Sequence, residues 1–110
     1  MGEQGAQHVV LGAGPVGRAL VERLVHDGAS VRVVTRHSVD GLPPGVEQRQ
    51  SDVTDAGLLT QVCAGADVIY GCVGLNYGAW SERWPPMMEG MLAAAHAVGA
   101  RFVFMDNLYM

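Results

Sequence analysis

The chain has 110 residues, 49% of them hydrophobic, which is enough for one globular domain with its own core. Seven basic residues stand against 11 acidic ones, a net charge of −4, and no segment concentrates basic side chains, which argues against a nucleic-acid-binding protein. No apolar run is long enough for a membrane span and no signal-like leader opens the chain, so no membrane partner and a cytoplasmic location are expected.

The chain is expected to begin with a disordered end and then to enter a buried strand. Residues 1–7 are small and polar, whereas His8–Leu11 is short and apolar. The ordered domain is therefore predicted to cover residues 8–110.

The stretch that follows, GAGPVG, carries the most information in the sequence. Its glycines have the GxGxxG spacing, and an amphipathic helix over Val16–Val25 comes directly after them. A strand, a glycine turn and a helix in this order are the context in which the motif binds the pyrophosphate of a dinucleotide. In that role Gly12 permits the tight bend, Gly14 lets backbone approach the pyrophosphate, and Gly17 lets helix and strand pack closely.

The predicted helix has clear signals at both ends. Pro15 suits the first helical position, where no backbone N–H is required. Gly28 is expected to end the helix in a left-handed conformation. The unpaired N–H groups and the positive dipole end of the helix would face the bound anion.

A β-branched second strand, Ser30–Thr35, completes a βαβ unit of about 30 residues. An NAD site would place Asp or Glu after this strand to bind the ribose hydroxyls, but here Thr35 is followed by Arg36. Arg36 can make a forked contact with a 2′-phosphate, which favours NADP over NAD, although an ordinary solvated loop residue is an equally simple interpretation. Asp40, farther along the loop, is a weaker candidate for an NAD-type carboxylate.

A loop rich in Gly and Pro, 41–45, leads to a third strand, Val46–Gln50, whose polarity predicts a place at the sheet edge. Asp52 or Thr54 is then expected to cap a helix that runs over 58–65. In the alternative interpretation, the carboxylate of Asp52 accepts a hydrogen bond from the adenine amino group.

The next segment, Ala66–Val73, is almost continuously apolar and predicts a central parallel strand that ends at Gly74. The polar and aromatic stretch Leu75–Trp84 either lines a substrate pocket or plugs the top of the sheet. Cys63 and Cys72 are expected to be reduced and apolar in character, with a disulfide as the poorer alternative. The histidines and cysteines lack metal-ligand spacing, so no metal site is predicted.

The last predicted elements are a helix and a fifth strand. Pro85 and Pro86 suit the opening turn of a helix that ends at Gly99, and Arg101–Met105 is the strand. Strands and helices thus alternate along the whole chain. The right-handed crossover rule then predicts an α/β fold, a doubly wound Rossmann-type parallel sheet of about five strands in the order 3-2-1-4-5.

Taken together, these motifs resemble the extended and atypical short-chain dehydrogenase/reductases, the NAD(P)-dependent epimerase/dehydratase group. The resemblance rests on GAGPVG after the first strand, TR after the second, SDV after the third and the apolar fourth strand. It implies a pyrophosphate site made by Gly12, Ala13, Gly14, Pro15, Val16 and Gly17. It further implies that the adenosine ribose is contacted by Thr35 and Arg36, and the adenine by Asp52 and Val53. The nicotinamide ribose would be contacted by Val73 and Gly74.

The sequence departs from the family pattern in two ways. Extended members usually have GxxGxxG after a Thr, whereas this chain has GxGxxG after Leu11, which favours an atypical member. The family's proton-transfer pair is a Tyr and a Lys four residues later, and this chain has no Lys; Asn107 lies near the place of the family's catalytic Ser or Thr. No catalytic residue is assigned, and the chain is expected to be truncated after the fifth strand and inactive alone.

Two functions of different classes fit these features. The first is the NADP-preferring, dinucleotide-binding part of a reductase or epimerase/dehydratase that acts on a small-molecule substrate. The alternative is a non-catalytic NAD(P)-sensing regulatory domain, and a third possibility is a chain whose incomplete pocket binds nothing tightly. The apolar fifth strand at a sheet edge also predicts self-association.

Overall fold

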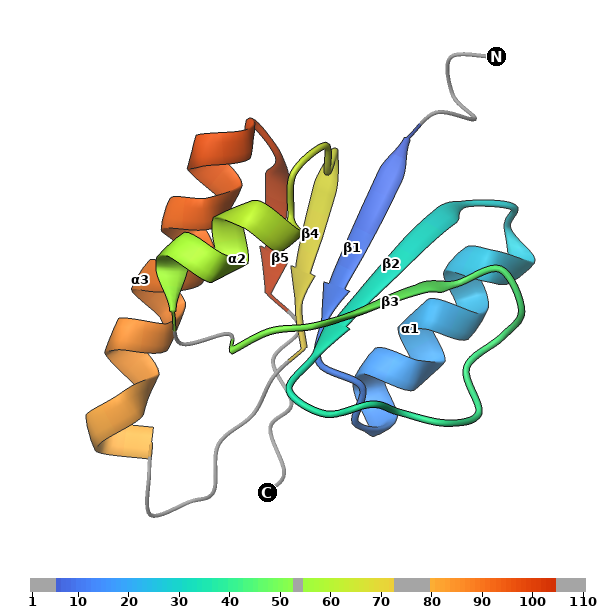
Figure 1. Cartoon of the computed structure of the whole chain (residues 1–110), viewed down its shortest axis with the longest axis horizontal. Coiled ribbons are helices and arrows are strands. Elements are labelled where there is room, and N and C mark those ends of the chain that lie inside the picture. The colour runs from blue at the N-terminus through green and yellow to red at the C-terminus, as the bar shows by residue number, and fades with distance from the viewer. Residues whose placement is uncertain (1–5, 53–54, 73–79, 105–110) are drawn as a thin grey trace.

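A five-stranded parallel sheet with helices on both faces forms the domain (Figure 1). The computed structural model describes residues 6–52, 55–72 and 80–104. The elements in chain order are β1 (Gln7–Leu11), α1 (Pro15–His26), β2 (Ser30–Thr35), β3 (Glu47–Gln50), α2 (Ala56–Val62), β4 (Val68–Gly71), α3 (Trp80–Val98) and β5 (Arg101–Phe104). The strand order β3-β2-β1-β4-β5 confirms the order predicted from the sequence.

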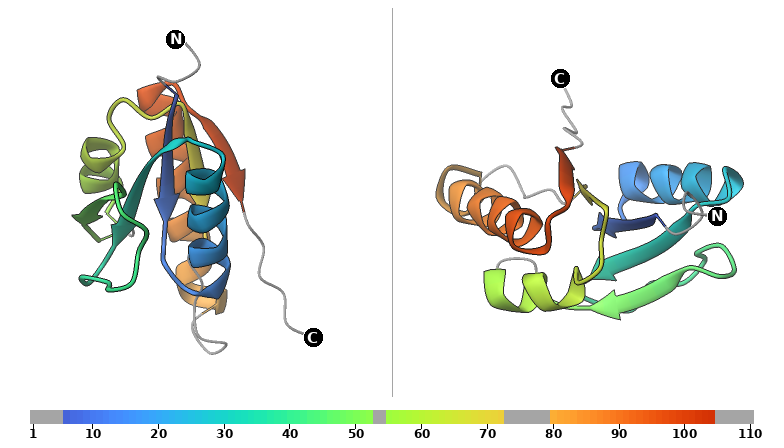
Figure 2. Two further views of the ribbon diagram at one scale, coloured as in Figure 1. Left: turned by 90° about the vertical axis from the view of Figure 1, so that its right-hand side faces the viewer. Right: turned by 90° about the horizontal axis from the view of Figure 1, so that it is seen from above.

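The sheet separates two apolar cores. Val10 faces α1, where it packs with Val21 and Val33, whereas Leu11 faces the opposite side and belongs to the core that Leu59 of α2 and other residues of α3 complete. The two views in Figure 2 show α1 on one side of the sheet and α2 and α3 together on the other. A strand covered on both faces needs apolar residues at successive positions, which explains the unbroken apolar run of β1.

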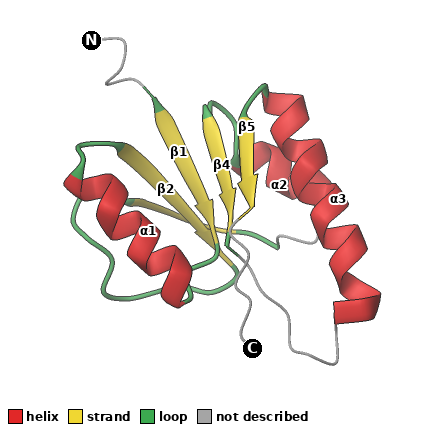
Figure 3. Cartoon of the chain, turned by 180° about the vertical axis from the view of Figure 1, so that it is seen from behind, coloured by secondary structure: helices red, strands yellow, loops and turns green. Residues whose placement is uncertain are grey.

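All the strands are parallel, so their carboxyl ends lie at one edge of the sheet, next to the beginning of α1 (Figure 3). The pairing register places Leu11 at the end of β1 opposite Val34 in β2 and Gly71 in β4. The chain crosses from β3 on one side of β1 to β4 on the other, which creates a topological switch point beside β1. Ligands of open α/β sheets bind at such points.

Both ends of α1 agree with the predicted signals. Pro15 is the first helical residue, and Gly28 has a φ of +83°, in the left-handed region. The backbone N–H of Gly28 donates to the carbonyl of Val25 at 2.9 Å, and that of Ala29 donates to Leu24 at 2.9 Å. These bonds satisfy carbonyl groups in the last turn that the helix itself leaves unpaired.

The first strand begins one residue earlier than predicted, so Gln7 does not belong to a disordered end. Its backbone N–H donates to Asp67 Oδ2 at 2.7 Å, and its side-chain Oε1 accepts from Ser30 Oγ at 3.0 Å. Polar bonds to the neighbouring strands therefore extend β1 beyond its apolar part. Residues 1–5 lie outside the described residues.

The cap of α2 was predicted at the wrong residue. Asp55, and not Asp52 or Thr54, precedes the helix, and Asp55 Oδ1 accepts from the backbone N–H of Leu58 at 3.1 Å. Because a capping side chain reaches the N–H two or three residues ahead, the helix start at Ala56 selects Asp55. Thr54 lies outside the described residues.

The third helix also begins earlier than the proline signal indicated. It begins at Trp80, so Pro85 and Pro86 lie within it and not at its first turn. The two prolines remove two backbone N–H donors from the helix. The helix has 19 residues, so most of its backbone N–H groups are still present. The part of the predicted aromatic segment from Trp80 onward is therefore helix, and 73–79 lies outside the described residues.

The fourth strand is shorter than predicted. It covers Val68–Gly71, because Ala66 closes the turn after α2, with its N–H on the carbonyl of Cys63 at 3.0 Å. At the edges of the sheet lie the polar strand β3, as predicted, and β5, which is described as far as Phe104. Self-association through β5 stays a prediction.

Among the described residues, no helix combines the length and the apolar character that crossing a membrane requires. The same part of the chain contains no group of His, Cys, Asp or Glu side chains arranged to hold a metal ion.

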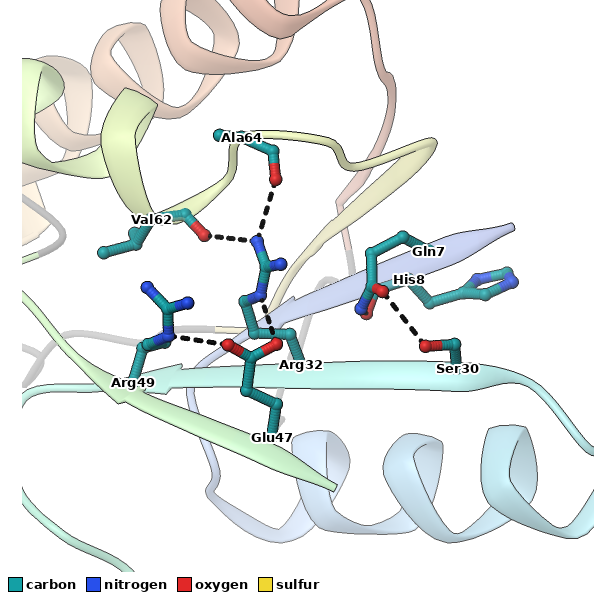
Figure 4. A network of polar contacts seen from close by, with 8 residues as sticks. All are labelled: Gln7, His8, Ser30, Arg32, Glu47, Arg49, Val62 and Ala64. Atoms are coloured by element: carbon teal, nitrogen blue, oxygen red, sulfur yellow. Dashed lines mark hydrogen bonds and ion pairs between the residues drawn. The ribbon is translucent and has the colours of Figure 1, made fainter. Parts of the chain in front are cut away.

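A polar network around Arg32 ties β2, β3 and α2 together (Figure 4). The Arg32 side chain is only 14% exposed, and its Nε donates to Glu47 Oε1 at 2.9 Å. Its Nη1 donates to the carbonyls of Val62 at 2.8 Å and Ala64 at 3.0 Å, at the carboxyl end of α2. A cation at this end of a helix is favourable for the helix dipole.

We expect acidification to weaken this network through Glu47. The hydrogen bond from Arg32 is the largest cause that lowers the pKa of Glu47 below its ordinary value of 4.5, and Arg49 adds to it. A carboxyl group with a lowered folded-state pKa stabilises the fold above its unfolded-state pKa, and this stability is lost as the pH falls through the folded-state pKa. Because Glu47 is 39% exposed, the loss is at most about 1 kcal/mol.

Urea unfolding of the wild type and of Glu47→Gln between pH 7 and pH 3 measures this effect. The variant should be the less stable protein at pH 7. The difference in the free energy of unfolding between the two proteins should shrink below about pH 4.5, where the glutamate of the unfolded chain begins to take up a proton. If the two proteins differed by the same free energy of unfolding at every pH, the stabilising role given to the Glu47 carboxylate would be contradicted.

Candidate functional site

The glycine turn lies at the switch point, held on both sides by the neighbouring strands. The backbone N–H of Gly12 donates to the carbonyl of Val34 at 2.9 Å, and the N–H of Cys72 donates to that of Leu11 at 2.9 Å. The ends of β1, β2 and β4 therefore meet around the start of α1.

Two of the three glycines are required by the geometry of the protein itself. Gly12 has a φ of +103°, which side-chain-bearing residues rarely adopt. A Cβ atom on Gly17 would lie closer than 3.0 Å to the carbonyl oxygen of Gly12 and 3.5 Å from Cys72 Cβ. These findings confirm the tight bend at Gly12 and the close helix–strand packing at Gly17.

Gly14 is different, because nothing in the described protein fills the space beside it. Its backbone is extended and it is exposed, and apart from its chain neighbours no atom of the described residues lies within 4 Å of the position where a Cβ would stand. An open backbone surface at this position agrees with the predicted approach of a ligand.

The first turn of α1 offers hydrogen-bond donors to a ligand. Arg18 N–H donates to the Gly14 carbonyl at 2.8 Å, which is the first bond of the helix. The preceding N–H groups, those of Val16 and Gly17, have no partner within the helix, and Pro15 has no N–H. No side chain among the described residues caps this turn, and the turn contains no acidic residue. The turn is therefore suited to bind an anion.

The end of β2 carries the two residues predicted at the adenosine ribose. Thr35 is buried, and its hydroxyl donates to the carbonyl of His37, so toward a ligand the hydroxyl oxygen is an acceptor. Arg36 is exposed, and within the described part of the chain it has neither an ion pair nor a hydrogen bond from its side chain.

The segment after β3 returns to the same edge of the sheet. The N–H of Ser51 donates to the Thr35 carbonyl at 2.9 Å, which holds the next residue, exposed Asp52, near the end of β2. The Asp52 carbonyl accepts from the N–H of Asp55 at 3.1 Å. The other residues predicted at the adenine and the nicotinamide ribose, Val53, Val73 and Gly74, lie outside the described residues.

Both cysteines are free thiols, as expected. Burial raises the pKa of Cys63 to about 11 and that of Cys72 to about 11. Both therefore remain protonated at neutral pH and are poor nucleophiles. Cys72, although near the glycine turn, acts in packing against the α1 side of the sheet.

The sequence analysis assigned no role to Arg18, although the side chain reaches the glycine turn. Its Nε donates to the carbonyl of Ala13 in the glycine turn at 3.2 Å. Helical side chains lean toward the helix N-terminus, so a long side chain four residues after Gly14 returns to the turn. The four-residue spacing between Gly14 and Arg18 is the sequence signal from which this contact could have been predicted.

Comparisons with known proteins agree with this geometry. A family model described as NAD(P)H-binding matches residues 12–109. A search of curated proteins gave no match. Among solved structures, uronate dehydrogenase from Agrobacterium tumefaciens is 28% identical, with a TM-score of 0.77 over 93% of this chain and 41% of that one. A mutant of that enzyme complexed with NAD gives 27% identity, a TM-score of 0.78 and the same coverage.

A third solved structure, a putative epimerase from Bacteroides thetaiotaomicron, has the same fold, with 24% identity and a TM-score of 0.71 over 90% of this chain and 46% of that one. The present chain thus spans less than half the length of these solved proteins.

Proposed function

The chain belongs to the NAD(P)H-binding family, and we propose that this NAD(P)-binding Rossmann domain serves a cytoplasmic oxidoreductase or epimerase/dehydratase of the short-chain dehydrogenase/reductase type. The proposal includes a small-molecule substrate and a preference for NADP over NAD. The observation that carries it is the uncapped first turn of α1 behind the open backbone of Gly14.

The residues present fit a dinucleotide. The free N–H groups of Val16 and Gly17 bind the pyrophosphate, and the bare backbone of Gly14 lets it approach without a clash. The cofactor supplies the hydride chemistry. The protein supplies the position and the electrostatic environment in which the nicotinamide meets its substrate.

The preference for NADP rests on the end of β2. Neither Thr35 nor Arg36 offers a carboxylate to the ribose hydroxyls, whereas the Arg36 guanidinium is exposed and free to pair with a 2′-phosphate. The solved neighbour described above is complexed with NAD, so the preference is argued from this chain's own residues.

A non-catalytic NAD(P)-sensing domain is the second candidate, and one observation favours it. The chain contains no Lys, so the Tyr and Lys pair of the short-chain dehydrogenase/reductases is not present within these 110 residues. If the gene encodes a Tyr-x-x-x-Lys segment after Met110, the enzyme is supported; a partner-binding segment there supports the sensor.

Titration of the purified chain with NADPH and NADH tests the proposed function. We expect both to bind, NADPH about tenfold more tightly or better, because a charge-assisted bond to the 2′-phosphate contributes about 1.5 to 3 kcal/mol. Calorimetry or the fluorescence of the reduced nicotinamide gives the dissociation constants. If neither nucleotide bound at millimolar concentration, the dinucleotide assignment would fail; tighter binding of NADH would overturn the role of Arg36.

A further inference from the structure

Arg18 lies between the glycine turn and the loop that follows β2. Its Nε is hydrogen-bonded to the Ala13 carbonyl at 3.2 Å, and its Nη1 lies 3.5 Å from the position that a Cβ on Gly41 would occupy. Gly41 has a φ of +83° and belongs to the loop that passes the first turn of α1 in Figure 1. The guanidinium of Arg18 is thus held where the two segments approach each other.

Arg18 is also a cation without an acidic partner in the described part of the chain. Arg23 pairs with Asp27, and Arg32 and Arg49 share Glu47, whereas no carboxylate of the described residues lies within ion-pair distance of Arg18. A guanidinium has five N–H donors, and within the described part of the chain only the Nε donor of Arg18 is used in a hydrogen bond. Its terminal nitrogens therefore keep donors for a ligand.

The register of the sheet places this cation close to the adenosine end of the site. Leu11 is opposite Val34, so the glycine turn and the end of β2, with Thr35 and the following Arg36, leave the sheet side by side. A dinucleotide with its pyrophosphate on the turn places its adenosine ribose at the end of β2. The ribose 2′ position then lies in the region that Arg36 borders from the strand end and Arg18 from the helix.

We propose that Arg18 is a second anchor for the 2′-phosphate of NADP, which Arg18 holds from α1 and Arg36 holds from the end of β2. This inference rests on the proposed function and makes it more specific. A phosphomonoester carries about −1.5 to −2 charges at pH 7 and three acceptor oxygens, so it has oxygens for both guanidinium groups. The ribose hydroxyls of NAD bear no charge, so Arg18 should contribute much less binding free energy to NAD than to NADP.

The test compares NADPH, NADH and 2′,5′-ADP binding to the wild type, Arg18→Ala, Arg18→Lys and Arg23→Ala. We expect Arg18→Ala to weaken NADPH and 2′,5′-ADP binding by about tenfold or more, and NADH binding by less than about twofold. Arg18→Lys keeps the charge but loses the fork, so its loss is intermediate. Arg23→Ala removes a 75% exposed arginine of the same helix and should change none of the three.

Each other outcome counts against the inference. Equal losses of NADPH and NADH would assign Arg18 to the pyrophosphate or to support of the turn, and no loss of either would leave it outside the site. Thermal unfolding of each variant shows whether it folds, and Arg18→Lys still decides the matter if Arg18→Ala does not. If the wild type binds neither nucleotide, it is the proposed function that fails.

Discussion

Gly17→Ala is expected to lower the free energy of unfolding by about 3 kcal/mol, the upper part of the range for overpacked sites. The added methyl group would lie closer than 3.0 Å to the Gly12 carbonyl oxygen, which is a backbone atom and cannot turn aside. The strain is relieved only if α1 moves away from β1. Urea unfolding followed by circular dichroism measures this loss of free energy. Thermal unfolding should show a matching fall in Tm of about 10 °C or more.

Gly14→Ala is the matched control, because within the described part of the chain the same methyl group meets no atom within 4 Å apart from those of its chain neighbours. Its backbone is extended, so alanine adopts it without strain. The variant should therefore keep its stability within about 0.5 kcal/mol. It should still bind NADPH about tenfold more weakly, since an overpacked contact with the pyrophosphate costs about 1 to 3 kcal/mol. Equal stabilities of the two variants, or wild-type binding by Gly14→Ala, would contradict this division of roles.

Arg36→Asp is expected to reverse the nucleotide preference. The change replaces a cation that attracts the 2′-phosphate by a carboxylate that repels it, so NADPH binding should weaken by about 100-fold, or about 2.7 kcal/mol. The same carboxylate can accept hydrogen bonds from the ribose hydroxyls, so NADH should bind more tightly than in the wild type. Titration of both nucleotides measures the reversal.

Arg101→Asp makes the same change of charge at the opposite end of the sheet, where β5 begins with an exposed arginine. Its effect on the two nucleotides should be small and nearly equal, because only long-range screened charge is altered. If Arg36→Asp behaved like Arg101→Asp, Arg36 would be a solvated loop residue, the simpler of the interpretations made from the sequence.

The features predicted correctly from the sequence are those fixed by local rules. The φ of Gly12 and the crowding at Gly17 follow from the spacing of the motif and its position between a strand and a helix. The strand order follows from the alternation of elements and the hand of their crossovers. None of these needs knowledge of a distant side chain.

The errors arose where several residues offer the same local signal. Asp52, Thr54 and Asp55 are all good capping residues, and the choice depends on where α2 begins when Leu59 is buried in the core. Pro85 signals a first turn, yet α3 begins at Trp80. Tertiary packing overrides such signals.

Arg18 was missed for a related reason. Its approach to Gly41 joins a helix to a loop that lies beyond the next strand, and no periodicity within α1 reports such a contact. Only the direction of helical side chains, toward Ala13, was available from the sequence.

The contact of Gly17 with the Gly12 carbonyl has a thermodynamic consequence for the ligand. The bend at Gly12 packs closely against α1 without a bound nucleotide. Its conformational entropy is therefore lost when the chain folds and not when the nucleotide binds. Association then requires little reorganisation of the main chain, so nucleotides that differ only at the ribose should differ in affinity through direct contacts and not through different degrees of ordering of the bend.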